Sequence, residues 1–175
     1  MKVLLIGASG FLGRTVSYKL KQSGAEVLGT YHSNAKDDFV RLDILDVKSL
    51  IALYRAFQPD VVVWTLMNLE LEEEIAEAVM PVFCETIGMT RFVFLSTSVA
   101  YEKNMSEDVV PMLRSGDMYH PKYFNGKIKS EWIIQTTGNY YASGLCGIRC
   151  AFVLYGYGAK QRRFDCYHVL YGGRQ

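Results

Sequence analysis

The chain opens with the stretch Val3-Leu4-Leu5-Ile6-Gly7-Ala8-Ser9-Gly10-Phe11-Leu12-Gly13, in which an apolar run leads into glycines spaced G-x-x-G-x-x-G. Leu12, Val16 and Leu20 then recur at helical spacing, so the order predicted is strand, glycine-rich turn and helix. The first glycine allows a tight turn, the second lets a backbone approach phosphate groups, and the third lets the helix pack closely on the strand. The simpler alternative is a turn that only joins a strand to a helix.

We expect this turn to hold the pyrophosphate of a dinucleotide, because the unpaired N–H groups of a helix N-terminus attract an anion. The residues expected to contact this part of the cofactor are Gly7, Ser9, Gly10, Phe11, Leu12, Gly13 and Arg14.

Composition narrows the class of protein. A chain of 175 residues, half of them hydrophobic, can bury one substantial core. The formal net charge of +1 indicates neither a nucleic-acid footprint nor a surface for polyanions. The N-terminus reads as a strand rather than a signal peptide, and no apolar run approaches the length of a membrane span. We therefore expect a cytoplasmic protein with no nucleic-acid or membrane partner.

The four cysteines, Cys84, Cys146, Cys150 and Cys166, form no CxxC pair and have no paired spacing with histidine. This pattern favours reduced, buried thiols over a metal site or disulfides. We expect no metal.

Strands and helices alternate along the chain, which predicts an α/β fold: a Rossmann-type, doubly wound parallel sheet with helices on both faces. The predicted strands are 2–6, 26–31, 39–42, 61–66, 91–96 and 147–154, and the predicted helices are 11–23, 47–57, 70–87 and 123–136. The stretch 102–121 is the one long irregular segment, and such a segment is usually functional or mobile.

The predicted helix 70–87 begins with an acidic turn that contains Glu70, Glu72, Glu73 and Glu74. Negative charge at this end complements the helix dipole, so we interpret the run as a solvated first turn rather than a site. Pro81 lies inside the helix and predicts a kink or a break into two shorter helices.

Tyr123 and Lys127 lie four residues apart in a helical pattern, so their side chains share one face. An ammonium group close to a phenol favours the phenolate and makes acid–base work at neutral pH feasible. A surface pair is the alternative. The hydroxyls of Ser96-Thr97-Ser98 follow a predicted strand, at the edge where ligands bind in doubly wound sheets. One of them could hydrogen-bond a substrate carbonyl that Tyr123 protonates, although a cap or turn also explains them.

Together these features resemble the short-chain dehydrogenase/reductase superfamily, in its extended branch, the NAD-dependent epimerase/dehydratase superfamily. The motifs that carry the resemblance are Gly7–Gly13, Arg41–Asp46 with Asp43, Pro59–Val63, Leu95–Tyr101, Tyr123–Lys127 with Glu131, and Gly147–Arg149 followed by Val153–Gly156.

The resemblance implies roles for the site residues. Tyr123 is implied to be the general acid, and Lys127 to lower its pKa and hydrogen-bond the nicotinamide ribose. Alignment on Tyr101 selects Thr97 as the hydroxyl that orients the carbonyl, and distance to Tyr123 could equally select Ser98. For the cofactor, the resemblance also implies contacts of Asp43 and Ile44 near the adenine, and of Thr65 and Leu66 at the end of strand 61–66. Members of the family usually carry small residues beside the nicotinamide at this strand end, and Thr65-Leu66-Met67 is bulkier.

The choice between NADP(H) and NAD(H) depends on the segment after strand 26–31. An NAD enzyme usually places a carboxylate there for the ribose 2′-hydroxyl, but Gly29–Ser33 contains none. The missing charge and the nearby Arg14 favour NADP(H). NAD(H) stays possible, with Thr30 and His32 accepting the 2′-hydroxyl.

The sequence of the segment Gly29–Ser33 also resembles that of the dTDP-4-dehydrorhamnose reductase group. This resemblance implies NADPH-dependent reduction of a 4-keto nucleotide-linked sugar. The alternatives are an NAD-dependent sugar-nucleotide epimerase/dehydratase and a non-catalytic NAD(P)-binding sensor or regulatory subunit. The implied partner is a nucleotide-sugar substrate, and homodimers are common in this superfamily.

Length is the main departure from the extended branch, whose members carry a substrate domain of roughly a hundred further residues. We expect a NAD(P)-binding Rossmann domain over 1–157 and a short tail over 158–175, the remnant or start of a substrate domain. The chain is then either a fragment or a reduced form with an incomplete substrate pocket.

Overall fold

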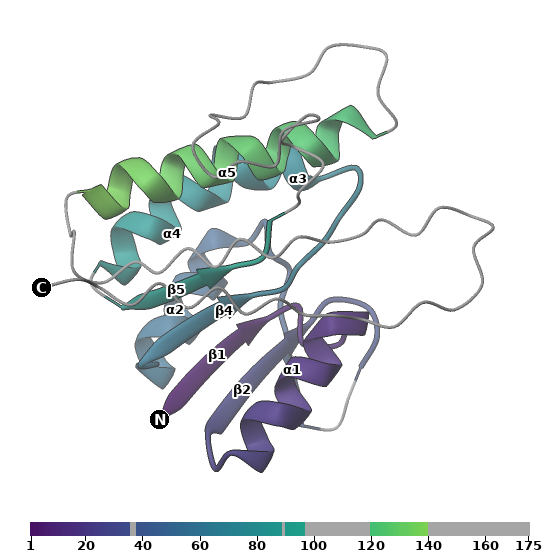
Figure 1. The fold of residues 1–175 in the computed structure, drawn as a ribbon, viewed down its shortest axis with the longest axis vertical. Coiled ribbons are helices and arrows are strands. Elements are labelled where there is room, and N and C mark those ends of the chain that lie inside the picture. The colour runs from purple at the N-terminus through teal and green to yellow at the C-terminus, as the bar shows by residue number, and fades with distance from the viewer. Residues whose placement is uncertain (36–37, 89, 97–119, 140–175) are drawn as a thin grey trace, which may run out of the picture.

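The computed structural model describes residues 1–35, 38–88, 90–96 and 120–139. Within them a parallel five-stranded sheet has the strand order β3-β2-β1-β4-β5 (Figure 1). The strands are β1 (Lys2–Ile6), β2 (Glu26–Tyr31), β3 (Phe39–Arg41), β4 (Val61–Trp64) and β5 (Arg91–Phe94). The helices are α1 (Phe11–Gln22), α2 (Val47–Phe57), α3 (Glu72–Glu74), the π-helical turn η1 (Ile75–Val79), α4 (Met80–Ile87) and α5 (Pro121–Asn139).

The sheet reverses its winding direction at β1, which lies in the middle. β2 and β3 extend from one side of β1, and β4 and β5 extend from the other. This is the doubly wound arrangement predicted from the alternation of strands and helices, and it is confirmed. In such a sheet, ligands bind beyond the carboxyl ends of the strands at the switch point.

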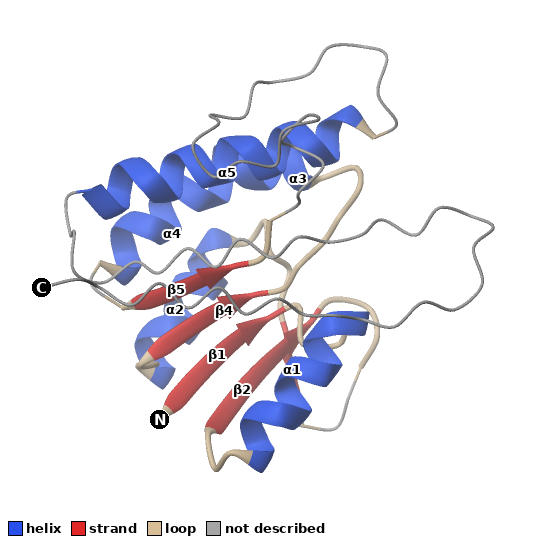
Figure 2. Cartoon of the chain, viewed as in Figure 1, coloured by secondary structure: helices blue, strands red, loops and turns tan. Residues whose placement is uncertain are grey.

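Helices cover both faces of the sheet (Figure 2). On one face, Leu4, Ile6, Val62 and Trp64 belong to a core cluster with Leu50 of α2 and with the inner side chains of η1 and α4. The other face carries a smaller cluster around Val3, Leu5 and Val63, against which α1 packs through Val16 and Leu20. The apolar run β4 is buried because both of its faces are covered.

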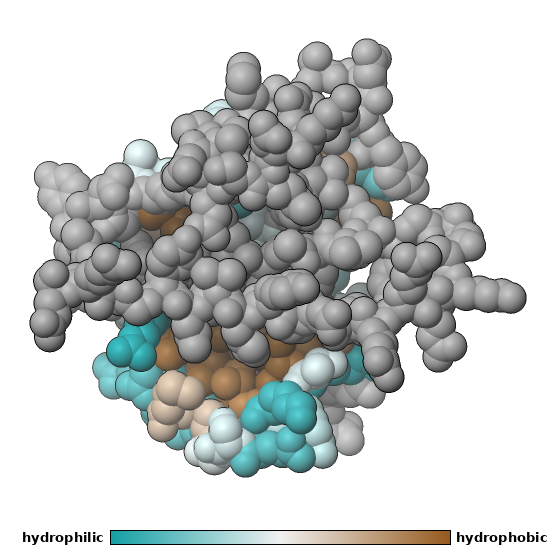
Figure 3. Space-filling model, viewed as in Figure 1, coloured by the Kyte–Doolittle hydropathy of each residue, from teal (hydrophilic) through white to brown (hydrophobic). Residues whose placement is uncertain are grey.

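A hydrophobic patch lies beside α1 on this second face of the sheet (Figure 3). The strand residues of the second cluster, which line this face of the sheet, are all apolar; they are Val3, Leu5, Val27, Phe39, Val61, Val63 and Val93. This face is therefore a packing surface rather than a solvated one.

The predicted helix 70–87 is divided in the way that Pro81 indicated. The π-helical turn η1 ends at Val79, and Pro81 occupies the first turn of α4. Proline lacks the N–H that would continue the helical hydrogen-bond ladder, and its ring collides with the preceding turn. A π-type turn relieves this collision by widening the helix.

The element bounds differ from the predicted ones mainly at strand ends. β4 and β5 each end two residues earlier than predicted, and α5 runs longer in both directions. The predicted strand 147–154 and the domain boundary at 157/158 lie outside the described residues. Within the described part of the chain, no helix is both long enough and apolar enough to cross a bilayer.

Candidate functional site

The carboxyl edge of the sheet gathers the segments predicted to hold a cofactor. Ile6 of β1 pairs with Trp64 of β4, and Trp64 pairs with Phe94 of β5, so these three strands end side by side. The glycine turn follows β1, Thr65 and Leu66 follow β4, and Ser96 lies just beyond β5. Segments far apart in the sequence therefore meet at one edge.

The glycine turn has the conformation that its spacing predicted. Gly7 has φ +81°, a left-handed conformation that other residues rarely adopt. The N–H of Gly10 donates to the carbonyl of Gly7 over 3.1 Å and closes the turn. A Cβ on Gly13 would lie only 2.2 Å from the Gly7 carbonyl oxygen, so residue 13 must be glycine for α1 to lie this close to the strand.

The N-terminus of α1 is open to a ligand. Gly10 is the N-cap residue, and no side chain caps the helix there. Gly10 is exposed, and a Cβ on it would come within 4 Å only of the Gly7 carbonyl oxygen, at 3.3 Å. A phosphate group can therefore approach the backbone at this point, where helix N–H groups and the helix dipole favour negative charge. The residues present fit a dinucleotide pyrophosphate.

Two threonine hydroxyls hold the turn in place. The Thr30 hydroxyl accepts a hydrogen bond from the N–H of Gly7 over 3.2 Å, and the Thr65 hydroxyl donates to the carbonyl of Ile6 over 2.8 Å. Both threonines are buried. Thr30 therefore supports the turn, and its contact with a ribose 2′-hydroxyl stays a prediction.

The other residues predicted to contact the cofactor differ in how far their side chains are exposed to solvent. Arg14 and His32 are exposed. Asp43 is exposed too, and its carboxylate accepts the N–H of Leu45 over 3.0 Å, whereas Ile44 is buried in the core. The remaining predicted cofactor residues are Ser9, Leu12 and Leu66, which are all half-buried, and Phe11, which is 64% exposed. Their contact with a cofactor stays a prediction.

Of the predicted hydroxyls after β5, Thr97 and Ser98 lie outside the described residues. Ser96 is described, and its hydroxyl is buried with no hydrogen-bond partner within the described part of the chain.

Tyr123 and Lys127 approach one another on α5, as their spacing predicted. The Lys127 ammonium lies 5.8 Å from the centre of the Tyr123 ring and 4.7 Å from that of Phe94. Tyr123 is 4% exposed and Lys127 is 1% exposed. The proximity of the pair is confirmed, and its catalytic role stays a prediction.

The ammonium of Lys127 has a carboxylate partner that sequence reasoning missed. Its Nζ lies 2.7 Å from Oε1 of Glu72, and it donates to the carbonyl oxygen of Leu66 over 2.9 Å. Glu72 is completely buried. This corrects one expectation: Glu72 does not belong to a solvated helix turn. The contact of Lys127 with a nicotinamide ribose stays a prediction.

Removing one partner of such a pair would leave a buried charge uncompensated, at a cost of roughly 3–5 kcal/mol.

A glycine brings the two partners together. A Cβ on Gly126 would lie 2.3 Å from the backbone carbon of Glu72, so α5 can contact α3 this closely only without a side chain at that position. Lys129 of α5 adds ion pairs with Glu73, at 2.6 Å, and with Glu77. Lys122 pairs more loosely with Glu70, at 3.8 Å. The acidic run thus faces the lysines of α5. In the sequence, the glycine directly before Lys127 was the available signal that another segment packs closely against α5.

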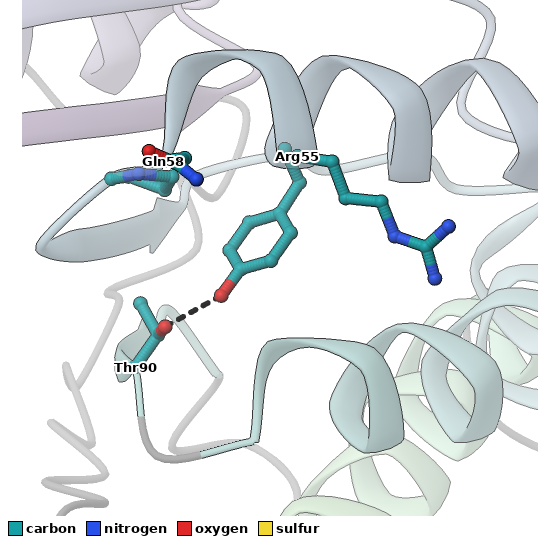
Figure 4. A pocket seen from close by; sticks show the side chains of 5 residues that line it. Arg55, Gln58 and Thr90 are labelled. Carbon is teal, nitrogen blue, oxygen red and sulfur yellow. Dashed lines mark hydrogen bonds between the residues drawn. The ribbon is translucent and has the colours of Figure 1, made fainter.

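Two further features lie away from the carboxyl edge. Burial raises the pKa of the Cys84 thiol to about 12, as expected for a reduced structural cysteine. The other three cysteines lie outside the described residues. A shallow hollow of about 360 Å³ lies before β4 and β5, at the opposite edge of the sheet, and is lined by Tyr54, Arg55, Gln58, Pro59 and Thr90. In Figure 4 the side chain of Arg55 extends away from Thr90.

The sheet order and the glycine turn at its carboxyl edge define an α/β protein of the Rossmann class. The chain belongs to the NAD dependent epimerase/dehydratase family, whose model matches residues 3–171.

Several known proteins are similar to this chain. The methionine adenosyltransferase 2 subunit beta of Xenopus laevis is 29% identical over 146 residues, which cover 73% of this chain and 40% of the relative. The solved dTDP-glucose 4,6-dehydratase of Bacillus anthracis, in complex with NAD, matches with a TM-score of 0.69 at 14% identity, over 85% of this chain and 54% of the other. The solved UDP-glucose 4-epimerase of Thermus thermophilus, also in complex with NAD, matches with a TM-score of 0.63 at 20% identity. The match covers 83% of this chain and 53% of the other.

The structural matches support the fold. The chain spans about two fifths of the length of the curated relatives and about half of the solved chains.

Proposed function

We propose that this chain binds a nicotinamide dinucleotide at the turn Gly7–Gly13 and takes part in the redox chemistry of a nucleotide-linked sugar. The observation that carries the proposal is the glycine turn itself. Gly7 is left-handed, Gly13 packs against the Gly7 carbonyl, and α1 begins at Gly10 without a side-chain cap. This combination provides backbone N–H groups for a pyrophosphate at the switch point of the sheet.

A bound nicotinamide would supply or accept the hydride, so the chain has to supply the proton and the orientation. We assign the proton to the Tyr123 hydroxyl, which would transfer it to the carbonyl oxygen of the substrate as that carbon is reduced. Thr97 or Ser98 would hydrogen-bond the same carbonyl oxygen. We assign to Lys127, whose Nζ lies 5.8 Å from the centre of the Tyr123 ring, the role of stabilising negative charge on the phenol oxygen.

Within this class we propose NADPH-dependent reduction of a 4-keto sugar, similar to the reaction of the dTDP-4-dehydrorhamnose reductase group. The absence of a carboxylate in Gly29–Ser33 and the exposure of Arg14 and His32 favour the 2′-phosphate of NADPH. The alternative is an NAD-dependent epimerase or dehydratase, in keeping with the NAD complexes of the similar structures.

Titration with NADPH and with NADH, followed by nicotinamide fluorescence, tests both the site and its preference. NADPH should bind more tightly than NADH, and equal or reversed affinities would contradict the preference. Net loss of absorbance at 340 nm with a 4-keto nucleotide sugar identifies a reductase, whereas conversion of a sugar without net cofactor oxidation identifies an epimerase or dehydratase.

Tyr123→Phe tests the proton donor. The variant should bind the dinucleotide almost as the unmodified chain does and should lose at least about a hundredfold in turnover, since general acid catalysis contributes on that scale. Turnover within a few fold of the unmodified chain would remove Tyr123 from the reaction.

A second function is favoured by the buried Lys127–Glu72 pair, which engages the ammonium within the protein. A chain of this kind could bind a dinucleotide without turnover and act as a regulatory subunit. The curated relatives are named as a subunit of methionine adenosyltransferase 2, which suggests a catalytic subunit of that type as the partner to test. Dinucleotide binding without oxidation by any sugar, together with co-elution with such a subunit, would select this function.

We also propose that the protein is cytoplasmic, on the grounds of its sequence, and that it forms a homodimer, as the resemblance implies. Sedimentation of the purified chain and fractionation of the source cells test the two parts of this proposal separately.

A further inference from the structure

The Lys127 ammonium lies beside the place where a ligand of the glycine turn would be. Lys127 donates to the Leu66 carbonyl oxygen, and the Leu66 backbone itself borders the turn: a Cβ on Gly7 would lie 2.9 Å from the Leu66 N and Cα atoms. A dinucleotide bound at this turn brings phosphate charge and ribose hydroxyls, and both attract an ammonium group.

The Lys127 ammonium is already paired with Glu72. One carboxylate oxygen of Glu72 lies 2.7 Å from Lys127 Nζ, and the other accepts the N–H of Asn68 over 3.1 Å, which helps to hold the carboxylate in place. The Phe94 ring lies against the same ammonium. Lys127 is therefore held by a carboxylate, a carbonyl and an aromatic face, all of them protein groups.

We propose that Glu72 is a positioning residue, a resident counter-ion that competes with the dinucleotide for the ammonium of Lys127. This inference rests on the proposed function. A dinucleotide that attracts the Lys127 ammonium toward its own oxygens weakens the pairing of that ammonium with the buried Glu72 carboxylate, and this loss opposes binding. A weaker partner at residue 72 makes that loss smaller.

Glu72→Gln provides the direct test, because glutamine preserves the shape and one acceptor oxygen but removes the charge. The dissociation constants for NADPH and NADH, measured by nicotinamide fluorescence on the full chain, should fall about tenfold, a change of about 1.4 kcal/mol. A residue that serves only the fold would leave the affinity unchanged or weaken it.

Two control variants isolate the pair. Glu73→Gln removes the neighbouring charge, which pairs with the half-buried Lys129, and should leave the affinity within twofold of the unmodified chain. Adding Lys127→Met to Glu72→Gln should abolish the gain, so that the double variant binds like Lys127→Met alone. Tighter binding by Glu73→Gln, or a gain that persists without Lys127, would overturn the competition.

If Glu72→Gln does not fold, Glu72→Asp decides by the same criterion, because a shorter carboxylate weakens the pair and keeps its charge. Affinity equal to or weaker than that of the unmodified chain overturns the inference. When the unmodified chain binds and the variant gains nothing, only the competition fails and the proposed function stands. If the variant binds the dinucleotide and the unmodified chain does not, the result supports the competition. If neither binds it, both proposals are overturned.

Discussion

Gly13 of α1 faces the carbonyl oxygen of Gly7 so closely that a Cβ on residue 13 would lie 2.2 Å from that oxygen and 2.7 Å from the Ala8 Cα. Both contacts are with backbone atoms, which cannot rotate away. The position of α1 on the sheet therefore depends on a missing side chain at one residue, and so does the shape of the turn beneath it.

Gly13→Ala should destabilise the protein by about 3 kcal/mol, because the added methyl group forces α1 away from β1. Urea unfolding measures the loss. Gly24→Ala is the matched control: Gly24 has φ +80°, but a Cβ there would meet no atom within 4 Å, so only backbone strain of about 1 kcal/mol is expected. Equal losses in the two variants would show that crowding at Gly13 is not the cause.

Gly10→Val should separate cofactor binding from folding. A Cβ on Gly10 meets only the Gly7 carbonyl oxygen, at 3.3 Å, and the residue has φ −69°, which any amino acid adopts. We expect a urea midpoint close to that of the unmodified chain and a dinucleotide affinity at least about tenfold weaker, because the branched side chain covers the start of α1. Unchanged affinity by fluorescence titration would place the pyrophosphate elsewhere.

Asp46 at the N-terminus of α2 should make stability depend on pH in the acidic range. Hydrogen bonds from the Ser49 hydroxyl and N–H lower the pKa of the Asp46 carboxyl below its usual value. Its contribution is then fully present above the pKa of the unfolded chain and is lost as the pH falls through the lower pKa of the folded state.

Asp46→Asn should keep the cap and remove this pH dependence, while Asp46→Ala should lose both. Urea midpoints of the three chains, compared at neutral pH and in acid, provide the measurement. The gap between Asp46 and Asp46→Ala should narrow in acid, and a gap that widens would contradict the assignment.

Gln58→Gly should stabilise the protein by about 0.5–1 kcal/mol. Gln58 ends α2 with φ 50°, a left-handed conformation that costs a side-chain-bearing residue energy and glycine almost none. Gln22→Gly, at the last helical residue of α1, is the control and should destabilise, since glycine is unfavourable inside a helix. A thermal melt of each variant decides, and a lower midpoint for Gln58→Gly would refute the prediction.

Much of the fold could be predicted from the sequence, because the patterns that indicate strands, helices and turns are local. The period of apolar residues identified β1, α1 and α2 with bounds correct within a residue, and Pro81 indicated where the helix after β4 would be interrupted. The glycine spacing predicted the turn because backbone conformation and close approach depend on those residues alone.

The contact partners of Lys127 could not be predicted from the sequence. Leu66 lies 61 positions before Lys127 along the chain. Gly126 indicated a close approach at this point of α5, but the sequence does not say which segment makes it. The same is true of Thr30, because the hydrogen bond that its hydroxyl accepts from the Gly7 N–H depends on the pairing of β2 with β1. An acidic run gives the same pattern whether it faces water or a buried lysine, so its role depends on packing.

By itself the sequence determined the order of the elements, the glycine turn and the shared face of Tyr123 and Lys127, since each depends on neighbours within a few residues. Only the tertiary structure decided which groups these side chains contact. The Lys127–Glu72 pair exists because α5 packs on α3 through Gly126, and that contact depends on how the sheet sets the helices in space.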